Sequence, residues 1–385
     1  MIVSRDGFTT VTKFPTNTWT LDGTINPHKS LCLDSLLKLH NININTCPDE
    51  KWIKSMSLLT SGSMTTIPWS QSMPSVQYKL FIKKLIKSVI GIMDSLSEDY
   101  YRNAWAPGGA LLSLLKTARV DPVVYREVSL SLDRDSGAFD TFKPGPGGFL
   151  QPIIYDRFAT RTGRLTVASG PNILTLKKEH RKLLKSTFIE GTVCSLDFSA
   201  LEARIILAEA GRSSSSNDLY AQLSNDLFSG QISRDSVKAA VISELYGSSK
   251  YGLGLRLGIS GVNLDTFVNK VREYFDTAKF RHRLKEEFTL TGKIKNKYGR
   301  LLELPDSQDH LLINTYAQST GVDVSLLGFK AVMDRLGTDG VRPLFVLHDA
   351  LILDVRNDRL PDVESVSSVA VPGYDTEFPL KFEKV

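Results

Sequence analysis

The sequence predicts an α+β protein, because strand patterns and helical patterns occur in separate runs along the chain. Two stretches have the pattern of buried strands, Thr192–Asp197 and Leu344–Val355. Two others carry apolar residues at helical spacing, Val76–Asn103 and Arg234–Gly247. The candidate functional residues lie within or beside these stretches.

The composition is that of a globular protein with two or three subdomains. Of its 385 residues, 42% are apolar and 23% are charged, which excludes the disordered and fibrous classes. A net charge of +5 permits a polyanionic partner without requiring one. The cysteines, Cys32, Cys47 and Cys194, lack metal-ligand spacing, so we expect a reducing compartment. No signal-peptide core and no run of about 18 apolar residues occurs, so we expect a cytoplasmic protein that does not enter membranes.

Asp197 marks the point where one pattern changes into another. Val193, Cys194 and Leu196 precede it in an apolar run, and apolar residues return at helical spacing from Leu201 onward. A carboxylate at the end of a buried strand is a common ligand for a divalent cation. The alternative is that Asp197 only caps the following helix, and this stretch alone does not decide between the two.

His348 and Asp349 occupy an equivalent place downstream. They follow the strand pattern that begins at Leu344 and precede a second apolar run, so we expect them at the turn of a hairpin. Asp197 and Asp349 are far apart in the chain and can meet only through the fold. Two metal ions held by two such carboxylates form the clamp used for in-line phosphoryl transfer.

The region ahead of these stretches carries weaker signals. Residues 1–74 are rich in Thr, Ser, Asn and Pro, and their one short helical candidate is Leu31–Leu39. In Val76–Asn103, lysines at positions 79, 83 and 87 lie opposite an apolar face, which suits either a phosphate backbone or a solvated surface. We expect the Pro-Gly-Gly after Ala106 to break this helix and Lys143–Gly148 to end the N-terminal region.

Arg164 follows a predicted Thr-Gly turn and precedes a basic cluster that runs from Lys177 to Lys185. Its guanidinium group has the geometry to bind a phosphate or the edge of a base. An arginine after a turn usually has neither role, so this signal is weak by itself.

The helix predicted at Arg234–Gly247 has Ser233 as a suitable N-cap and no internal proline or glycine. Four residues recur at every fourth position and share one broad face, namely Arg234, Lys238, Ile242 and Tyr246. This row suits a nucleoside triphosphate, with the cations toward the phosphates and the other two side chains toward the base. The alternative is an ordinary amphipathic helix, although a separate apolar stripe already exists at positions 237, 241 and 245.

These stretches occur in the order of the motifs of the DNA polymerase I family (family A), which the sequence resembles from about residue 155 to residue 385. Asp197–Arg204 resembles the first palm motif, Arg234–Gly247 the finger helix, and His348-Asp349 the last palm motif. Smaller similarities occur at Thr162-Gly163-Arg164, Pro171-Asn172, Tyr298-Gly-Arg300, Leu304-Pro305-Asp306, Asn314 with Gln318, and Phe378–Phe382. The ordered set of motifs indicates the family far more specifically than any single motif does.

The resemblance implies a right-hand polymerase with an antiparallel-sheet palm, helical fingers and a short helical thumb. We expect an N-terminal region of unclear role at 1–74, a thumb-like helical region at 75–140, palm at 141–212 and 291–385, and fingers at 213–290. About 140 residues ahead of the palm are too few for both a thumb and an exonuclease domain, so we expect no exonuclease.

The resemblance also implies roles for individual residues. Two magnesium ions, for which manganese can substitute, would be held by Asp197, Asp349 and the carbonyl group of Phe198. The nucleotide would be bound by Arg234, Lys238, Ile242, Tyr246 and Glu202. Lys238 would also donate a proton to the leaving pyrophosphate, and Glu202 with Tyr246 would shape the sugar pocket. The primer–template duplex would be contacted by Arg164, Asn314, Gln318 and His348.

The sequence departs from the family pattern at several positions. Ile242 and Ser243 stand where the family has an aromatic residue and a glycine, in the part of the helix that positions the template. Ala350 replaces the usual acidic residue after the His-Asp pair, and His310 replaces an arginine.

We therefore expect a template-directed DNA polymerase without proofreading, of the compact kind found in phages and plasmids. Its partners would be a primer–template DNA duplex, dNTPs and a replication accessory protein, and the chain would act as a monomer away from membranes. Two alternatives are a single-subunit RNA polymerase or primer-synthesising enzyme, and a catalytically idle nucleic-acid-binding relative. Glu202 argues against the first, and the presence of Asp197, Asp349 and Lys238 argues against the second.

Overall fold

The computed structural model divides the chain into two compact units, Met1–Glu98 and Asp99–Val385. The described residues are 2–4, 7–9, 19–21, 24–26, 74–77, 79–80, 98–131, 137–157, 159–214, 216–247, 250–258, 260–304 and 311–385. The predicted helix at Leu31–Leu39 and most of the one at Val76–Asn103 lie outside them, as do Cys32, Cys47, Pro305, Asp306 and His310. In the first unit, the antiparallel pairs are β1 (Ile2–Ser4) with β2 (Gly7–Thr9) and β3 (Trp19–Leu21) with β4 (Thr24–Asn26).

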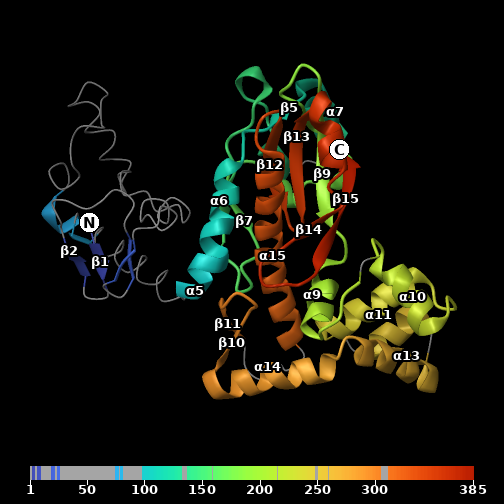
Figure 1. The fold of residues 1–385 in the computed structure, drawn as a ribbon. Coiled ribbons are helices and arrows are strands. Elements are labelled where there is room, and N and C mark those ends of the chain that lie inside the picture. The colour runs from blue at the N-terminus through green and yellow to red at the C-terminus, as the bar shows by residue number, and fades with distance from the viewer. Residues whose placement is uncertain are drawn as a thin grey trace, which may run out of the picture. The chain divides into compact units, whose positions relative to one another are not determined.

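The main sheet of the second unit has, among the described residues, five antiparallel strands in the order β12-β13-β9-β15-β14 (Figure 1). They are β9 (Gly191–Phe198), β12 (Val341–Leu347), β13 (Ala350–Arg356), β14 (Ser368–Ala370) and β15 (Glu377–Lys384). Strands β9, β12 and β13 are buried along most of their length, because most of their residues are apolar. The two predicted strand stretches are therefore confirmed.

Helices pack around this sheet, which confirms the predicted α+β class. The helices described from residue 98 onward are α5 (Glu98–Tyr100), α6 (Ala106–Leu114), α7 (Pro122–Ser131), α8 (Gly137–Asp140), α9 (Leu201–Glu209), α10 (Leu219–Phe228), α11 (Arg234–Tyr246), α12 (Lys250–Leu257), α13 (Gly261–Tyr274), α14 (Thr277–Thr291), α15 (Leu312–Leu336) and α16 (Leu360–Glu364). None of the described helices has the length and apolar content that crossing a membrane requires.

Short two-stranded ladders complete the second unit. The pairs are β5 (Arg119–Val120) with β8 (Leu184–Lys185), β6 (Ile154–Asp156) with β7 (Thr166–Ser169), and β10 (Lys293–Lys295) with β11 (Leu301–Glu303). The β6–β7 ladder brackets the Thr-Gly turn that carries Arg164, so this turn has regular structure on both sides.

Helix α15 lies along the sheet and packs against α6, α9, α14 and β14 (Figure 1). Gly328 of α15 lies close to β9, since a Cβ atom there would lie 2.7 Å from Cζ of Phe198. Any larger residue would have to displace this aromatic ring, which is itself buried. The glycine therefore sets the distance between the helix and the strand that ends at Asp197.

The Pro-Gly-Gly after Ala106 does not break a helix, so that prediction is wrong. A π-helical turn, Tyr101–Trp105, continues directly into α6, and Pro107 lies in the first turn of α6. Pro107 cannot donate a helical hydrogen bond, and it lies at the junction where the π turn gives way to α6. Gly108 is buried against α15, where a Cβ atom would lie 2.9 Å from Nη2 of Arg157 and 3.1 Å from Cδ1 of Leu326. The glycine permits close packing and does not act as a terminator.

The segment Lys143–Gly148 does interrupt regular structure, as predicted. Gly147 and Gly148 have φ angles of 67° and 81°, in the left-handed region that favours glycine. Only a single 3₁₀ turn, Pro146–Gly148, forms there.

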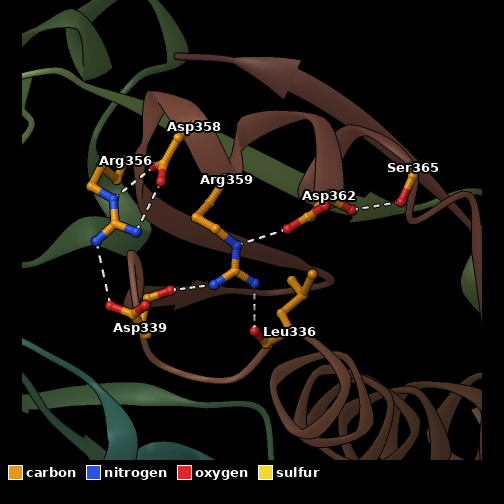
Figure 2. A network of polar contacts seen from close by, with 7 residues as sticks. All are labelled: Leu336, Asp339, Arg356, Asp358, Arg359, Asp362 and Ser365. Carbon is orange, nitrogen blue, oxygen red and sulfur yellow. Dashed lines mark hydrogen bonds and ion pairs between the residues drawn. The ribbon is translucent and has the colours of Figure 1, made fainter.

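The C-terminal end of α15 is held by the polar network shown in Figure 2. Nη2 of Arg359 donates to the carbonyl oxygen of Leu336 at 2.9 Å, and Nη1 donates to that of Asp339 at 2.6 Å. Arg359 also pairs with Asp362, and the neighbouring Arg356 pairs with Asp358. A cation at the C-terminus of a helix satisfies carbonyl groups that lack intrahelical partners and interacts favourably with the helix dipole.

Candidate active site

The two predicted metal ligands lie side by side at one end of the sheet. Strands β9 and β13 pair antiparallel with Asp197 opposite Ala350, and the N–H group of Phe198 donates to the carbonyl oxygen of Asp349 at 2.9 Å. Asp197 does not cap α9, because the N-cap is Ala200 and no side chain caps the helix there. The structure therefore excludes the capping interpretation and brings the two aspartates together.

His348 and Asp349 form the two-residue turn between β12 and β13, as predicted. Leu347 pairs with Ala350 across this turn, and His348 has a φ angle of 54°. Tight hairpin turns require a positive φ at their first central residue. Burial, followed by the charge of Arg164, lowers the pKa of His348 below its ordinary value, so this exposed imidazole is neutral at pH 7.

The electrostatics of the aspartates favour a bound cation. Burial raises the pKa of Asp197 to about 6, with a further contribution from the charge of Asp349 and an opposing one from Arg181. Burial also raises the pKa of Asp349. Within the described residues, neither carboxylate forms an ion pair with a Lys, Arg or His side chain. Two adjacent carboxylates without a paired cation are a fitting donor set for a divalent ion with oxygen ligands.

The ligand set is small. In the described ranges, no group of three or more His, Cys, Asp or Glu side chains is placed to hold a metal ion. Ala350 lies directly opposite Asp197 and supplies no third carboxylate. A metal here would therefore depend on Asp197, Asp349 and main-chain oxygens such as that of Phe198, a set that fits magnesium because magnesium keeps several waters.

A cavity opens beside the aspartates between the β12–β13 turn, α9 and α15. It is lined by Arg164, Leu165, Leu201, Glu202, Gln318, Gly321, Val322, Ser325, Leu326, Val346, His348 and Asp349. Predicted site residues from four separate parts of the sequence thus meet in one place. Asn314 is not among the lining residues, but its side-chain oxygen accepts a hydrogen bond from Nε2 of Gln318 at 2.6 Å.

Glu202 connects this cavity to helix α11. The hydroxyl group of Tyr246 donates to Oε2 of Glu202, and Nη2 of Arg164 lies 3.4 Å from Oε1. Burial raises the pKa of Glu202, and the contacts with Tyr246 and Arg164 oppose this effect. Both oxygens of the carboxylate are therefore engaged, one by α11 and one by the turn after β6.

Helix α11 has the local structure that the sequence predicts. Ser233 caps its N-terminus by accepting from the N–H of Ser236, and Gly247 ends it with a φ angle of 68°. Val237, Val241 and Leu245 are buried, as expected of the apolar stripe. The proposed nucleotide row has no buried member, because Arg234 and Lys238 are exposed and Ile242 and Tyr246 are half-buried.

Sequence reasoning missed Asp218 and Tyr220, which lie next to the cations of α11. Nε of Arg234 donates to Oδ2 of Asp218 at 2.6 Å. The ring centre of Tyr220 lies 5.8 Å from Cζ of Arg234 and 5.9 Å from Nζ of Lys238. Asp218 is also the N-cap of α10, and an Asp before an apolar helical pattern is the signal that would have located it.

Sequence reasoning also missed the contacts behind α11. Glu244 is 7% exposed and accepts from Nε and Nη2 of Arg272, at 3.1 and 3.0 Å. It accepts further bonds from Thr277 at 2.8 Å and Arg281 at 3.2 Å. This carboxylate therefore joins α11 to α13 and α14. The contacts lie on the side of α11 away from its open face, which is the face that carries Arg234 and Lys238.

Comparison with known proteins agrees with this arrangement. The model of the family described as DNA polymerase family A matches residues 153–383. The chain belongs to this family. It is 23% identical over 258 residues to the thermostable DNA polymerase I of Thermus aquaticus, covering 60% of this chain and 31% of that protein. It is 28% identical over 250 residues to the DNA polymerase I of Caldicellulosiruptor bescii, covering 57% and 29%.

The chain thus spans about a third of the length of the curated family A relatives it matches. A solved structure with a similar fold is the POL domain of Pol1 from M. smegmatis, in complex with a DNA primer-template and dNTP. The TM-score is 0.50 at 16% sequence identity, and the similarity covers 88% of this chain and 56% of that one.

Proposed function

We propose that this chain is a DNA-directed DNA polymerase that adds dNTPs to the 3′-hydroxyl group of a primer paired with a template. The observation that carries the proposal is the meeting of Asp197 and Asp349 at the paired ends of β9 and β13 in a family A polymerase chain. Two carboxylates at this place suit phosphoryl transfer assisted by divalent cations. The solved structure of similar fold contains a primer-template and dNTP, and we infer the same ligands here.

Asp197, Asp349 and the carbonyl group of Phe198 would hold two magnesium ions. When bound, these ions activate the primer hydroxyl group and stabilise the charge of the leaving pyrophosphate. Arg234 and Lys238 would bind the triphosphate, since both are exposed on the open face of α11. Lys238 would also donate a proton to the pyrophosphate, because it is the ammonium group on this face.

Glu202 and Tyr246 would select the sugar, while Ile242 would pack against the base. The carboxylate of Glu202 is half-buried and already accepts from Tyr246, so a ribose 2′-hydroxyl group would find neither room nor a free acceptor. This arrangement favours dNTPs over NTPs and supports the DNA polymerase proposal over an RNA polymerase or primer-synthesising enzyme.

Arg164, Gln318 and His348 would contact the duplex from the cavity, with Asn314 held beside Gln318. In the same proposal, residues 141–212 and 291–385 form the palm, 213–290 the fingers and 75–140 the thumb, while 1–74 have a separate role. The grouping of α10, α11 and α13 beyond the end of α9 is consistent with a finger region (Figure 1).

The decisive experiment is primer extension with magnesium on DNA and RNA templates, with dNTPs and NTPs compared. We expect dNTP incorporation by the wild type and at least a thousandfold loss, about 4 kcal/mol in the barrier, for Asp197→Ala or Asp349→Ala. Asp334→Ala is a matched control, because this exposed carboxylate pairs, among the described residues, only with Lys330 on the surface of α15. Duplex binding should persist in all three variants.

A wild type that binds the duplex but extends no primer would contradict the proposal and favour the idle nucleic-acid-binding alternative. Substantial extension by either aspartate variant would show that the chemistry occurs elsewhere.

A further inference from the structure

A buried polar network lies beneath the turn that carries Arg164. At its centre is Asp323 of α15, which is 1% exposed. Its Oδ1 accepts from the hydroxyl group of Tyr100 at 3.0 Å, and its Oδ2 accepts from Nδ2 of Asn296 at 2.7 Å. Nη2 of Arg157 lies 3.8 Å from the same carboxylate. Buried polar groups of this kind are tolerated only when they are held in a defined geometry.

Arg300 is fixed in this network at both ends. Its N–H group donates to Oδ1 of Asn296 at 2.9 Å, which anchors the backbone. Its guanidinium group donates to the hydroxyl group of Tyr100 at 3.2 Å and to the carbonyl oxygen of Arg157 at 3.0 Å. The residue is 7% exposed, so its side chain has no room to adopt another position.

The guanidinium group of Arg300 lies directly against Gly163. A Cβ atom at Gly163 would be 2.2 Å from Nη1 and 2.5 Å from Cζ of Arg300. Gly163 has a φ angle of 78°, and its N–H group donates to the carbonyl oxygen of Thr160 at 3.1 Å. The position of this turn is therefore set by the arginine beneath it.

Arg164 follows this glycine, and few contacts of its own side chain fix its position. Its side chain is 45% exposed, and its guanidinium group reaches Glu202 at 3.4 Å. A long exposed side chain is placed mainly by its backbone, because surface contacts contribute little to fixing it. The path from the network to the cavity thus runs through Arg300, Gly163 and Arg164 to Glu202.

We infer that Arg300, held by Tyr100 and the carbonyl group of Arg157, is a positioning residue that places Arg164 against Glu202. The inference rests on the proposed function, since Glu202 is proposed to select the sugar. Arg300 touches no substrate in this scheme and acts only through the turn at Gly163. A loss of Arg300 would leave Arg164 free to move away, and Glu202 would lose one of its two partners.

A double-mutant cycle tests whether Arg300 acts through Arg164. The readout is the ratio of kcat/KM for a dNTP to that for the matching NTP, which a general loss of stability does not change. We expect Arg300→Lys and Arg164→Ala each to lower this ratio about tenfold, and the double variant to lower it no further than the larger single effect. A double variant whose loss is the product of the two single losses would overturn the inference.

A pair of glycine variants supplies a matched control. Gly163 and Gly292 both have a positive φ, of 78° and 70°, but a Cβ atom at Gly292 meets nothing within 4 Å. Both alanine variants incur the same kind of backbone strain, and only Gly163→Ala displaces Arg300. We expect Gly163→Ala to lower the dNTP-to-NTP ratio of kcat/KM as Arg300→Lys does. Gly292→Ala should keep the wild-type ratio. Equal ratios in the two glycine variants would contradict the inference.

The Tyr100→Phe variant provides a further test of the inference if the substitutions at Arg300 or Gly163 prevent folding. It removes only the hydroxyl group that bridges Arg300 and Asp323, and circular dichroism would verify the fold. We expect a smaller fall in the ratio of kcat/KM for a dNTP to that for the NTP. In a chain that already carries Arg164→Ala, we expect Tyr100→Phe to cause no further fall. A wild type that extends no primers would contradict the proposed function, whereas an active wild type with independent effects of Arg300 and Arg164 would contradict this inference alone.

Discussion

At Glu202, the side chain has both of its carboxylate oxygens engaged before any nucleotide arrives. A ribose 2′-hydroxyl group placed there would lack a hydrogen-bond partner, at a cost of about 3 kcal/mol or a discrimination of about a hundredfold. We expect Glu202→Ala to reduce the preference for dNTPs over NTPs to about tenfold or less and to lower overall activity. Steady-state kinetics with both substrates would measure this change.

The control for this prediction is Glu303→Ala, because Glu303 is 72% exposed and its one ion pair within the described part of the chain is with Lys293. It should keep the wild-type sugar preference. A wild type that uses NTPs as well as dNTPs would instead favour the RNA polymerase alternative.

At Asp197, the raised pKa predicts how the stability of the metal-free chain depends on pH. The pKa rises from an ordinary 3.8 to about 6, so the folded state holds this proton more tightly than the unfolded state. The associated stability is fully present below pH 3.8 and is lost as pH rises through 6. Since Asp197 is open to solvent on one side, we expect an effect of at most about 1 kcal/mol.

Urea unfolding with a chelator at pH 4.5 and pH 7.5 would test this expectation. Asp197→Asn should gain stability relative to the wild type at the higher pH only, because asparagine does not titrate. Magnesium should stabilise the wild type at pH 7.5 by mass action and have a smaller effect on the variant. A constant difference between the two proteins across this pH range would refute the assignment.

At the scale of elements, Glu244 joins α11 to α13 and α14 and thereby supports the open face that carries Lys238. Removing it leaves Arg272 and Arg281 without their shared carboxylate, although both arginines retain some access to water. We expect Glu244→Ala to lower the free energy of unfolding by about 2 kcal/mol. Chemical denaturation would measure it, with Glu286→Ala as the control.

Glu286 is 63% exposed and lies beside His282 on α14, so its removal should change stability by less than about 0.5 kcal/mol. Equal effects of the two substitutions would show that Glu244 does not connect the helices energetically.

The helices and strands also show which structural features can be predicted from local sequence patterns alone. The strand before Asp197, the hairpin turn at His348 and the N-cap of α11 depend on residues within a few positions, so the sequence predicted them correctly. The glycine at 108 was misinterpreted because its role depends on α15, more than 200 residues away. The partners of Arg234 and Glu244 were missed for the same reason, since ion pairs across 16 and 28 residues form only after the helices pack.

At the scale of the whole molecule, the candidate site is assembled from segments that span most of the second unit. The sheet supplies Asp197 and Asp349, α15 supplies Gln318, and α11 reaches the same cavity through Tyr246. Because α15 packs against both the sheet and α9, a change in its position would move the proposed duplex contacts and the proposed sugar pocket together. The site therefore depends on the packing of the unit as a whole.

The last prediction concerns proofreading. The family A match occupies residues 153–383, and the proposed function assigns one catalytic site to it, at Asp197 and Asp349. We therefore expect the purified chain to leave a 3′-mismatched primer at full length in magnesium without dNTPs. Gel analysis of an end-labelled mismatched primer beside a matched one would measure any shortening. The Asp197→Ala variant serves as the control, because shortening that persists in it would come from a second site and would contradict this prediction.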